Sequence, residues 1–185
     1  SIDMITSLWD WNEVRAENGL PAIDMGIGLN TDTVVSGNIG SPKRMDYTVI
    51  GDGVNLAARL ESACKQYAAR ILVSEFTHSN LKGVYRSREI DRVIVKGKTE
   101  PVGIYEVLDF HTADTFPNVM EVLNYFKDGL GKYRVGDWDL AIKSFKEGQR
   151  LNPKDYVTEM YIDRCQNLKA DPPKNWDGVW VMTSK

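Results

Sequence analysis

The feature that most restricts the fold of this chain is a change of pattern near residue 110. Before it, short runs rich in β-branched residues and glycine alternate with helical patterns, whereas from Met120 onward the periodicity is helical through most of the remaining sequence. A chain of 185 residues has room for one ordinary domain and a small annex. We therefore predict an α+β domain with one mixed or antiparallel sheet over residues 1–110, and a linker, helices and a Trp-containing tail over residues 111–185.

Within the α+β region, the pattern predicts a specific order of elements. Apolar residues at helical spacing after Ile5 predict a first helix that ends near Asn18. A second helix is expected from Asp52, a candidate N-cap, to about Gln66. In chain order, the expected strands are residues 23–29 and 33–39, joined by a turn at 30–32, then 47–50, 70–74, 85–97 and 100–110, with a short helix at 75–82.

The composition excludes several classes of protein. With 42% hydrophobic and 26% charged residues the chain is typical of a globular protein, and its net charge of -3 gives no general attraction to nucleic acid or to an anionic membrane. Cys64 and Cys165 indicate neither a disulfide framework nor a structural zinc site, and no apolar run approaches the length of a membrane span. We expect a cytoplasmic chain, or the cytoplasmic part of a membrane-anchored or multidomain sensor protein. Because it begins inside a helical pattern without an initiator Met, we also expect a fragment of a longer protein.

Two familiar glycine patterns are incomplete in this sequence. The string GDGVNL begins like a dinucleotide-binding fingerprint, but Leu56 occupies the position of its third glycine, and GNIGSPKR does not have the spacing of a P-loop. His78 and His111 are single histidines without partners placed for catalysis. No acidic residue has the context of a metal site, so neither Asp24 nor Asp46 is nominated as a ligand.

The helix expected from Asp52 carries two polar side chains beside its apolar stripe. At 100° per residue, Asn55 and Arg59 lie about 40° apart on the rim of that stripe. Arg59 offers a planar, permanently charged fork that suits phosphate oxygens, and Asn55 offers a neutral amide that suits a hydroxyl or ring oxygen. From spacing alone, a solvated face or a local salt bridge with Glu61 or Asp52 is the simpler interpretation.

The strings around this helix carry more information than its spacing. DYTVIGDGVNLAARLES at residues 46–62, GIGLNTDTVVSGNIGS before it and VKGKTEPVGIYEV after it closely resemble the second half of the class III nucleotidyl cyclase catalytic domain. That is the family of adenylate and guanylate cyclases, and the resemblance is strongest to bacterial, especially cyanobacterial, members. It covers about residues 1–110 and implies a ferredoxin-like α+β fold.

The resemblance implies roles for four residues. Asn55 and Arg59 match the catalytic pair of the family, in which Asn orients the ribose and Arg stabilises charge on the α-phosphate while the 3′-hydroxyl attacks. Lys96 matches the lysine that binds the terminal phosphates, and Thr48 matches the purine-recognition position of bacterial adenylate cyclases. Without the resemblance, Thr48 would be interpreted as a strand-surface hydroxyl and Lys96 as a hairpin-turn cation.

The resemblance also implies groups that this chain does not supply. The family uses two divalent cations, Mg²⁺ or Mn²⁺, bound by two aspartates of the first half of its domain, and we expect that half, with its purine-binding lysine, to lie outside residues 1–185. ATP is the implied substrate, and the implied assembly is a head-to-tail homodimer with shared sites at the twofold interface. We therefore expect this chain to supply the purine-, ribose- and phosphate-binding half of each site and to be inactive by itself.

The helical annex resembles a single tetratricopeptide repeat. The matching positions are Gly129, Tyr133, Gly136, Asp137, Trp138, Ala141, Phe145 and Pro153. One repeat cannot form a solenoid with a peptide-binding groove, so we favour a capping bundle packed on the α+β region over a partner-docking module. A role in dimerisation or regulation is an alternative.

Three hypotheses for function follow. The leading one is an adenylate cyclase that converts ATP to cyclic AMP and pyrophosphate. The first alternative is a guanylate cyclase, because the Thr48 hydroxyl can both donate and accept hydrogen bonds. The second alternative is a non-catalytic cyclase-like module for dimerisation or partner binding.

Overall fold

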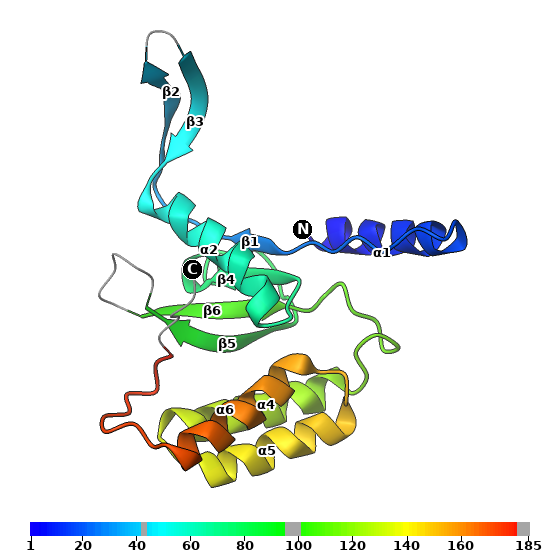
Figure 1. The fold of residues 1–185 in the computed structure, drawn as a ribbon, viewed down its shortest axis with the longest axis vertical. Coiled ribbons are helices and arrows are strands. Elements are labelled where there is room, and N and C mark those ends of the chain that lie inside the picture. Colours follow the sequence, from blue (N-terminus) through cyan, green and yellow to red (C-terminus); the bar gives the residue numbers. More distant parts are fainter. Residues whose placement is uncertain (42–43, 95–100, 181–185) are drawn as a thin grey trace.

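The computed structural model describes residues 1–41, 44–94 and 101–180 (Figure 1). The elements in chain order are α1 (Ile2–Glu17), β1 (Ile27–Leu29), β2 (Val35–Ser41), β3 (Arg44–Ile50), α2 (Asp52–Gln66), β4 (Ile71–Ser74), α3 (Glu75–His78), β5 (Ser87–Val93), β6 (Val102–Val107), α4 (Val119–Arg134), α5 (Trp138–Leu151) and α6 (Tyr156–Ala170). The predicted α+β order and the run of helices after it are both present. The first helix ends as predicted, with Asn18 as its C-cap and Gly19 in the left-handed conformation at φ 68°.

Four of the strands form a mixed sheet in the order β1-β4-β6-β5. β1 runs parallel to β4, and the β4–β6 and β5–β6 pairs are antiparallel. Two parallel strands need a crossover connection, and α2 forms part of it by packing against both β1 and β4. The main sheet is therefore mixed, which is one of the two arrangements that the sequence predicted.

β2 and β3 form a second, two-stranded sheet that projects from the rest of the molecule as a hairpin (Figure 1). The prediction of a single sheet is wrong, and the turn expected at residues 30–32 does not join paired strands. β1 lies instead beside the completely buried β4, whereas the hairpin side chains are mostly exposed, Val35 to 64% and Tyr47 to 75%. Pairing of β1 with the buried β4 thus outweighs local pairing with β2. The strand expected at 47–50 also begins earlier, at Arg44.

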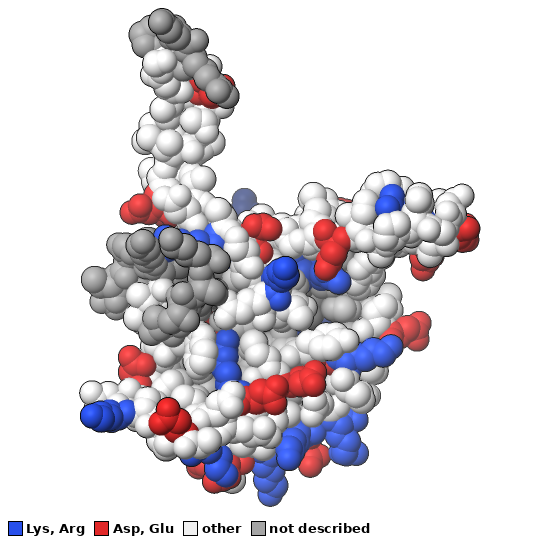
Figure 2. All heavy atoms as spheres, viewed as in Figure 1, with Lys and Arg blue, Asp and Glu red and all other residues white. Residues whose placement is uncertain are grey.

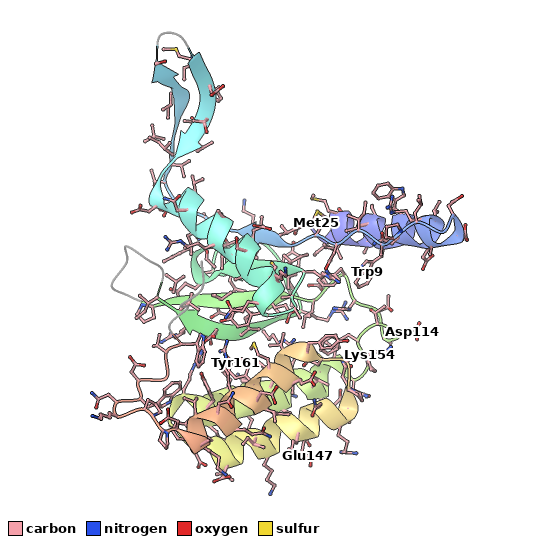
Figure 3. All side chains as sticks on the ribbon, in the orientation of Figure 1. Trp9, Met25, Asp114, Glu147, Lys154 and Tyr161 are labelled. Atoms are coloured by element: carbon pink, nitrogen blue, oxygen red, sulfur yellow. The ribbon has the colours of Figure 1, made fainter. Side chains whose placement is uncertain are left out.

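The main sheet has an apolar layer on each of its faces. On one face, α1 contributes Ile5 to a small core that includes Val73, and Trp9 packs at its border (Figure 3). On the other face, α2 and the annex share one continuous core with Leu72 and Ile104. The helices after residue 110 therefore complete the core of the α+β region rather than forming a core of their own.

The annex consists of α4, α5 and α6, joined by short connections. Gly129 of α4 lies against Phe145 of α5, where an added Cβ would come within 2.6 Å of the ring, so the glycine permits close packing of the two helices. In the tail, Trp176 donates a hydrogen bond from Nε1 to the backbone carbonyl of Tyr133 at 3.0 Å. The capping bundle expected from the sequence is confirmed as a bundle packed on the sheet, while the tetratricopeptide resemblance stays a prediction.

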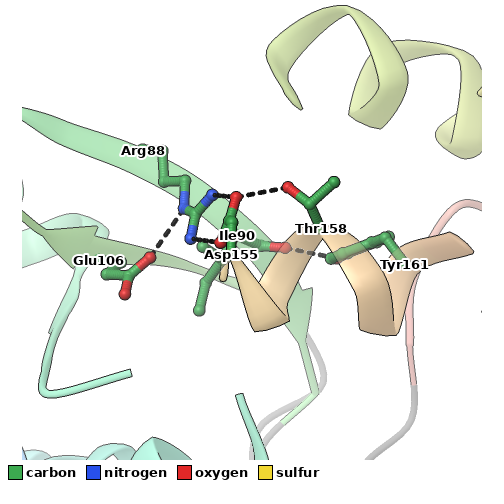
Figure 4. Close-up of polar contacts among 6 residues, drawn as sticks. All are labelled: Arg88, Ile90, Glu106, Asp155, Thr158 and Tyr161. Atoms are coloured by element: carbon green, nitrogen blue, oxygen red, sulfur yellow. Dashed lines mark hydrogen bonds and ion pairs between the residues drawn. The ribbon is translucent and has the colours of Figure 1, made fainter. Parts of the chain in front are cut away.

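A buried ion network joins the annex to the sheet (Figure 4). Arg88 of β5 donates from Nε to Glu106 of β6, and from Nη1 and Nη2 to the two carboxylate oxygens of Asp155, each at 2.7 Å. Asp155, the N-cap residue of α6, also accepts a hydrogen bond from Thr158 at 2.5 Å. The side chains of Arg88, Glu106 and Asp155 are only 2–5% exposed. Nearby, the Tyr161 hydroxyl donates to the backbone carbonyl of Ile90, which is a further contact between α6 and β5.

Candidate functional site

The predicted polar pair lies on α2. Leu56, Leu60 and Cys64 of this helix are buried, whereas Asn55 is exposed and Arg59 partly exposed. Their Cα atoms are one helical turn apart, about 6 Å along the axis. The structure therefore brings Asn55 and Arg59 to one accessible edge of the helix, as the periodicity predicted.

The start of this helix differs from the prediction. Gly51, not Asp52, occupies the N-cap position, and its φ of 152° lies in a region that favours glycine. Asp52 is instead the first helical residue, where its carboxylate interacts favourably with the positive end of the helix dipole. The N-cap prediction was thus wrong by one residue.

Close contacts with β1 and the following loop fix the position of α2. Gly28 of β1 lies so near the helix that an added Cβ would come within 2.2 Å of the backbone nitrogen of Glu61. At the first turn, Asn30 donates from Nδ2 to the backbone carbonyl of Gly53 at 3.0 Å. Sequence reasoning did not identify these residues as part of the site. The only available signal was a glycine inside a short strand, which often marks close backbone approach.

Thr48 lies at a different place from Asn55 and Arg59. It is exposed on β3, opposite Gly37 of β2, in the projecting hairpin. In Figure 2 the part of this arm below its grey tip is mostly white, and its exposed apolar side chains include Val35, Met45 and Tyr47. Lys96, the fourth predicted residue, lies outside the described residues. Among the described residues, Thr48 thus lies on a different element from Asn55 and Arg59.

Two cavities of the structure are lined by other residues. One, of about 690 Å³, lies beside the C-terminal half of α2 and is lined by residues that include Asp24, Glu61 and Arg70. The other, of about 220 Å³, lies between the sheet and the annex and includes Arg88 and His111. Burial, together with the nearby positive charges of Arg88 and Arg86, lowers the pKa of His111 to about 4, so its imidazole is neutral at pH 7. Neither cavity contains Thr48, Asn55 or Arg59.

A metal centre is not formed by the part of the chain that the structure describes. Within residues 1–41, 44–94 and 101–180, no three side chains of His, Cys, Asp or Glu cluster in a way that could hold a metal ion. These residues therefore do not fit the two cations that the resemblance implies. Over the same ranges, no helix is both long enough and apolar enough to span a bilayer.

Comparison with known proteins identifies the family. Residues 1–108 match the family described as "Adenylate and Guanylate cyclase catalytic domain". The chain belongs to this cyclase family. The resemblance first seen around residues 46–62 is thereby confirmed, and the α+β region is a cyclase catalytic fold followed by a helical segment.

Three of the relatives of the cyclase chain are named as adenylate or adenylyl cyclases. It is 37% identical over 153 residues to "Adenylate cyclase, terminal-differentiation specific" from Dictyostelium discoideum, which covers 80% of this chain and 7% of the relative. It is 47% identical over 114 residues to an adenylate cyclase from Anabaena cylindrica, which covers 58% and 23% of the two chains. The crystal structure of the adenylyl cyclase CyaB from P. aeruginosa aligns at 38% identity with a TM-score of 0.51, covering 58% of this chain and 55% of that one. The cyclase chain thus spans less than a quarter of these two curated relatives and about half of the solved chain.

Proposed function

We propose that this chain is part of an adenylate cyclase that converts ATP to 3′,5′-cyclic AMP and pyrophosphate. The observation that carries the proposal is the 47% identity to the Anabaena adenylate cyclase over 114 residues, together with the placement of Asn55 and Arg59 on one accessible edge of α2. In the proposed reaction, the ribose 3′-oxygen forms a bond to the α-phosphorus and the bond to the leaving pyrophosphate breaks. The hydroxyl proton passes to water or a nearby base.

Asn55 and Arg59 are the proposed catalytic residues. Phosphoryl transfer depends mainly on positioning and on stabilisation of charge that develops on the phosphate oxygens. The Arg59 guanidinium provides fixed donors for that charge, and the Asn55 amide holds the ribose so that its hydroxyl faces the α-phosphate. Because both groups extend from one turn of α2, a single rigid helix sets the angle between them.

Thr48 and Lys96 are the proposed substrate-binding residues. The Thr48 hydroxyl would face the edge of the purine, and Lys96 would bind the terminal phosphates. Thr48 lies on an exposed arm, so a second surface has to close over it before it can contact a base in a dry environment. We infer that this surface comes from a second copy of the chain in a head-to-tail homodimer.

The exposed apolar side chains of the hairpin support this assembly. Val35, Met45 and Tyr47 are 61–75% exposed, which is costly for a monomer and suits a surface that is covered on association. The proposed site is therefore shared, with this chain contributing the side that binds purine, ribose and phosphate. We place the protein in the cytoplasm, alone or as the cytoplasmic part of a membrane-anchored or multidomain sensor.

The proposed cofactors are two Mg²⁺ or Mn²⁺ ions. When bound, such ions lower the pKa of the attacking hydroxyl and neutralise phosphate charge. Since the described residues do not form a metal cluster, the ligands are proposed to be carboxylates of the first half of the domain. In this proposal the residues of this chain contact the nucleotide and do not bind the metal ions.

The test uses the full-length protein with ATP or GTP and a divalent cation. We expect cyclic AMP as the main product, with kcat reduced by about 10² or more in Arg59→Ala and Asn55→Ala, and with KM for ATP little changed. Lys65→Ala is a matched control, because Lys65 is an exposed cation on the same helix. Equal turnover of Arg59→Ala and wild type would refute the assigned role.

The identity of the cyclic nucleotide product distinguishes the proposed function from its two alternatives. A guanylate cyclase is the second candidate, because Thr48 can pair with either purine edge, and preferential formation of cyclic GMP would establish it. A dimeric protein that binds nucleotide or a partner but forms no cyclic product with either substrate would instead be the non-catalytic module.

A further inference from the structure

The annex reaches the end of the helix that carries Asn55 and Arg59. Tyr67, the C-cap residue of α2, donates a hydrogen bond from its hydroxyl to Asp91 Oδ2 of β5 at 2.5 Å. Arg164 of α6 donates from Nη1 to the same oxygen at 2.7 Å. One carboxylate oxygen therefore joins α2 to α6, two elements that are nearly 100 residues apart in sequence.

This link is completely inside the protein. Tyr67 and Asp91 are each 1% exposed and Arg164 is 7% exposed. The other oxygen of Asp91 accepts a hydrogen bond from the backbone nitrogen of Arg92 at 2.8 Å, so the carboxylate is held on both sides. Buried charge-assisted hydrogen bonds of this kind allow little movement of their partners, because each lost bond leaves a buried charge unpaired.

Local structure explains why the three groups meet. The pairing of β5 with β6 shifts register between Glu89 and Asp91, a bulge that redirects the following side chains. The Arg164 guanidinium lies 5.4 Å from the ring centre of Tyr67 and 5.0 Å from that of Tyr161. Arg164 is thus enclosed by aromatic rings as well as bound to Asp91, which fixes its orientation.

The other contacts of α2 make its C-terminal end important for the orientation of the helix. In its middle, α2 rests on Gly28, where its backbone approaches β1 most closely. Asn55 lies before that contact and Tyr67 after it, about 18 Å apart along the helix axis. The Asn30 hydrogen bond to Gly53 holds the first turn, so Tyr67 is the third point that fixes the helix, and its release leaves the angle of α2 less restrained.

We propose that Arg164 is a positioning residue of the cyclase: acting through Asp91 and Tyr67, it holds α2 at the angle that Asn55 and Arg59 need. This inference rests on the proposed function for its catalytic consequence, but the link itself does not. The annex then becomes part of the catalytic unit. The similarity to the Dictyostelium relative covers 80% of the chain and so extends beyond the 108 residues of the cyclase match.

The test cuts the link at either end in the full-length protein. Tyr67→Phe removes only the hydroxyl and leaves Asp91 paired with Arg164, so the fold should be retained. We expect kcat to fall roughly tenfold with KM for ATP within about twofold of wild type, because misplacement of Asn55 and Arg59 acts on the transition state. Arg164→Met should have a larger effect, and Arg164→Lys, which keeps the cation, should recover part of the activity.

Tyr161→Phe is the matched control. It removes a buried hydroxyl from the same interface, one that bonds to the backbone carbonyl of Ile90 and not to Asp91. A second readout is amide hydrogen exchange over residues 52–66, which should be faster in Tyr67→Phe and Arg164→Met and unchanged in Tyr161→Phe.

The outcomes separate this inference from the proposed function. If wild type forms no cyclic nucleotide, the proposed function fails, and hydrogen exchange alone decides whether the annex holds α2. If wild type is active and Tyr67→Phe matches Tyr161→Phe in both kcat and exchange, the positioning role is overturned. A change in KM without a change in kcat would also overturn it, because that result indicates altered ground-state binding rather than a misplaced catalytic pair.

Discussion

Replacement of Arg88 by Met should destabilise the chain more than any surface ion-pair substitution. Arg88 makes three hydrogen bonds of 2.7 Å, one to Glu106 and two to Asp155, and its side chain is 4% exposed. Met has a similar length and no charge. The substitution therefore leaves two carboxylates buried between the sheet and α6 with no cation beside them.

The size of the effect follows from that burial. Breaking a buried pair by removing one partner costs about 3–5 kcal/mol, because the remaining charge stays desolvated. For a chain of this length, each kcal/mol lowers Tm by roughly 2–4 °C, so we expect a drop of roughly 6–20 °C. By contrast, Lys169→Met breaks the exposed pair of Lys169 with Asp139 and should cost less than about 1 kcal/mol.

The effect should also depend on pH. In the wild-type chain, burial raises the pKa of Glu106, and the positive charge of Arg88 only partly offsets the rise. Burial acts in the same direction on Asp155, but the charge and hydrogen bonds of Arg88 outweigh it and keep that pKa below its usual value. Without Arg88, both folded-state pKa values rise above those of the unfolded chain. Such groups favour folding at low pH and lose that contribution as the pH rises, so the deficit of Arg88→Met should shrink between pH 7 and pH 5.

Thermal and urea unfolding of wild type, Arg88→Met, Lys169→Met and the triple variant Arg88→Met, Glu106→Gln, Asp155→Asn provide the assay. The triple variant removes all three charges and should recover much of the lost stability. If Arg88→Met costs no more than Lys169→Met at pH 7, or if its deficit grows toward pH 5, the account of this network is incorrect.

Three further predictions concern the helix position, pH and the annex. Gly28→Ala should lower the Tm and the cyclase kcat of the full-length protein, because its Cβ would meet backbone atoms of α2; Gly37→Ala, which has no atom within 4 Å, is the control measured beside it. His111, with a folded pKa of about 4 against about 6.5 unfolded, should reduce stability as the pH falls from 6.5 toward 4, since the unfolded chain binds the proton first. Unfolding of His111→Phe between pH 7 and pH 5 should show a weaker pH dependence than wild type. Deletion of the annex after residue 110 should produce aggregation or dye-binding hydrophobic surface, seen by light scattering and ANS fluorescence, because the core under α4 and α6 is shared with the sheet.

Each of these has a result that contradicts it. Equal Tm and kcat for Gly28→Ala and Gly37→Ala would mean that β1 and α2 separate at little cost. An unchanged pH profile for His111→Phe would mean that folding does not lower the pKa of this imidazole. A soluble, cooperatively folded fragment of residues 1–110 would show that the annex is an independent attachment.

The helices were the part of the fold that could be predicted from the sequence. α2 ends at Gln66 as expected, because the helix is amphipathic and its apolar spacing is a local property. Strand positions were also approximately correct. Strand pairing was not, because it depends on which distant residues bury each strand: β1 pairs with β4, whose nearest residue is about 40 positions away.

For the candidate site too, local features could be predicted from the sequence and long-range contacts could not. Asn55 and Arg59 followed from the helix and from a specific string, and both are local. The pairing of Asp91 with Arg164 could not be predicted, since in the sequence they are two ordinary charged residues 73 positions apart. Only the bulge in β5 and the docking of α6 bring them together, and neither has a pattern that can be read in advance.

The contacts between β5 and α6 determine when this chain can finish folding. They join residues 67, 71 and 73 positions apart, so during synthesis β5 is complete well before its partner helix leaves the ribosome. Until then, Arg88 and Asp91 lie on an apolar face without the α6 groups that neutralise them. We expect these charges to prevent early collapse of the sheet, so that docking of α6 triggers a single concerted folding step. Proteolysis of ribosome-bound chains of increasing length should therefore show resistance appearing only after residue 170 has emerged.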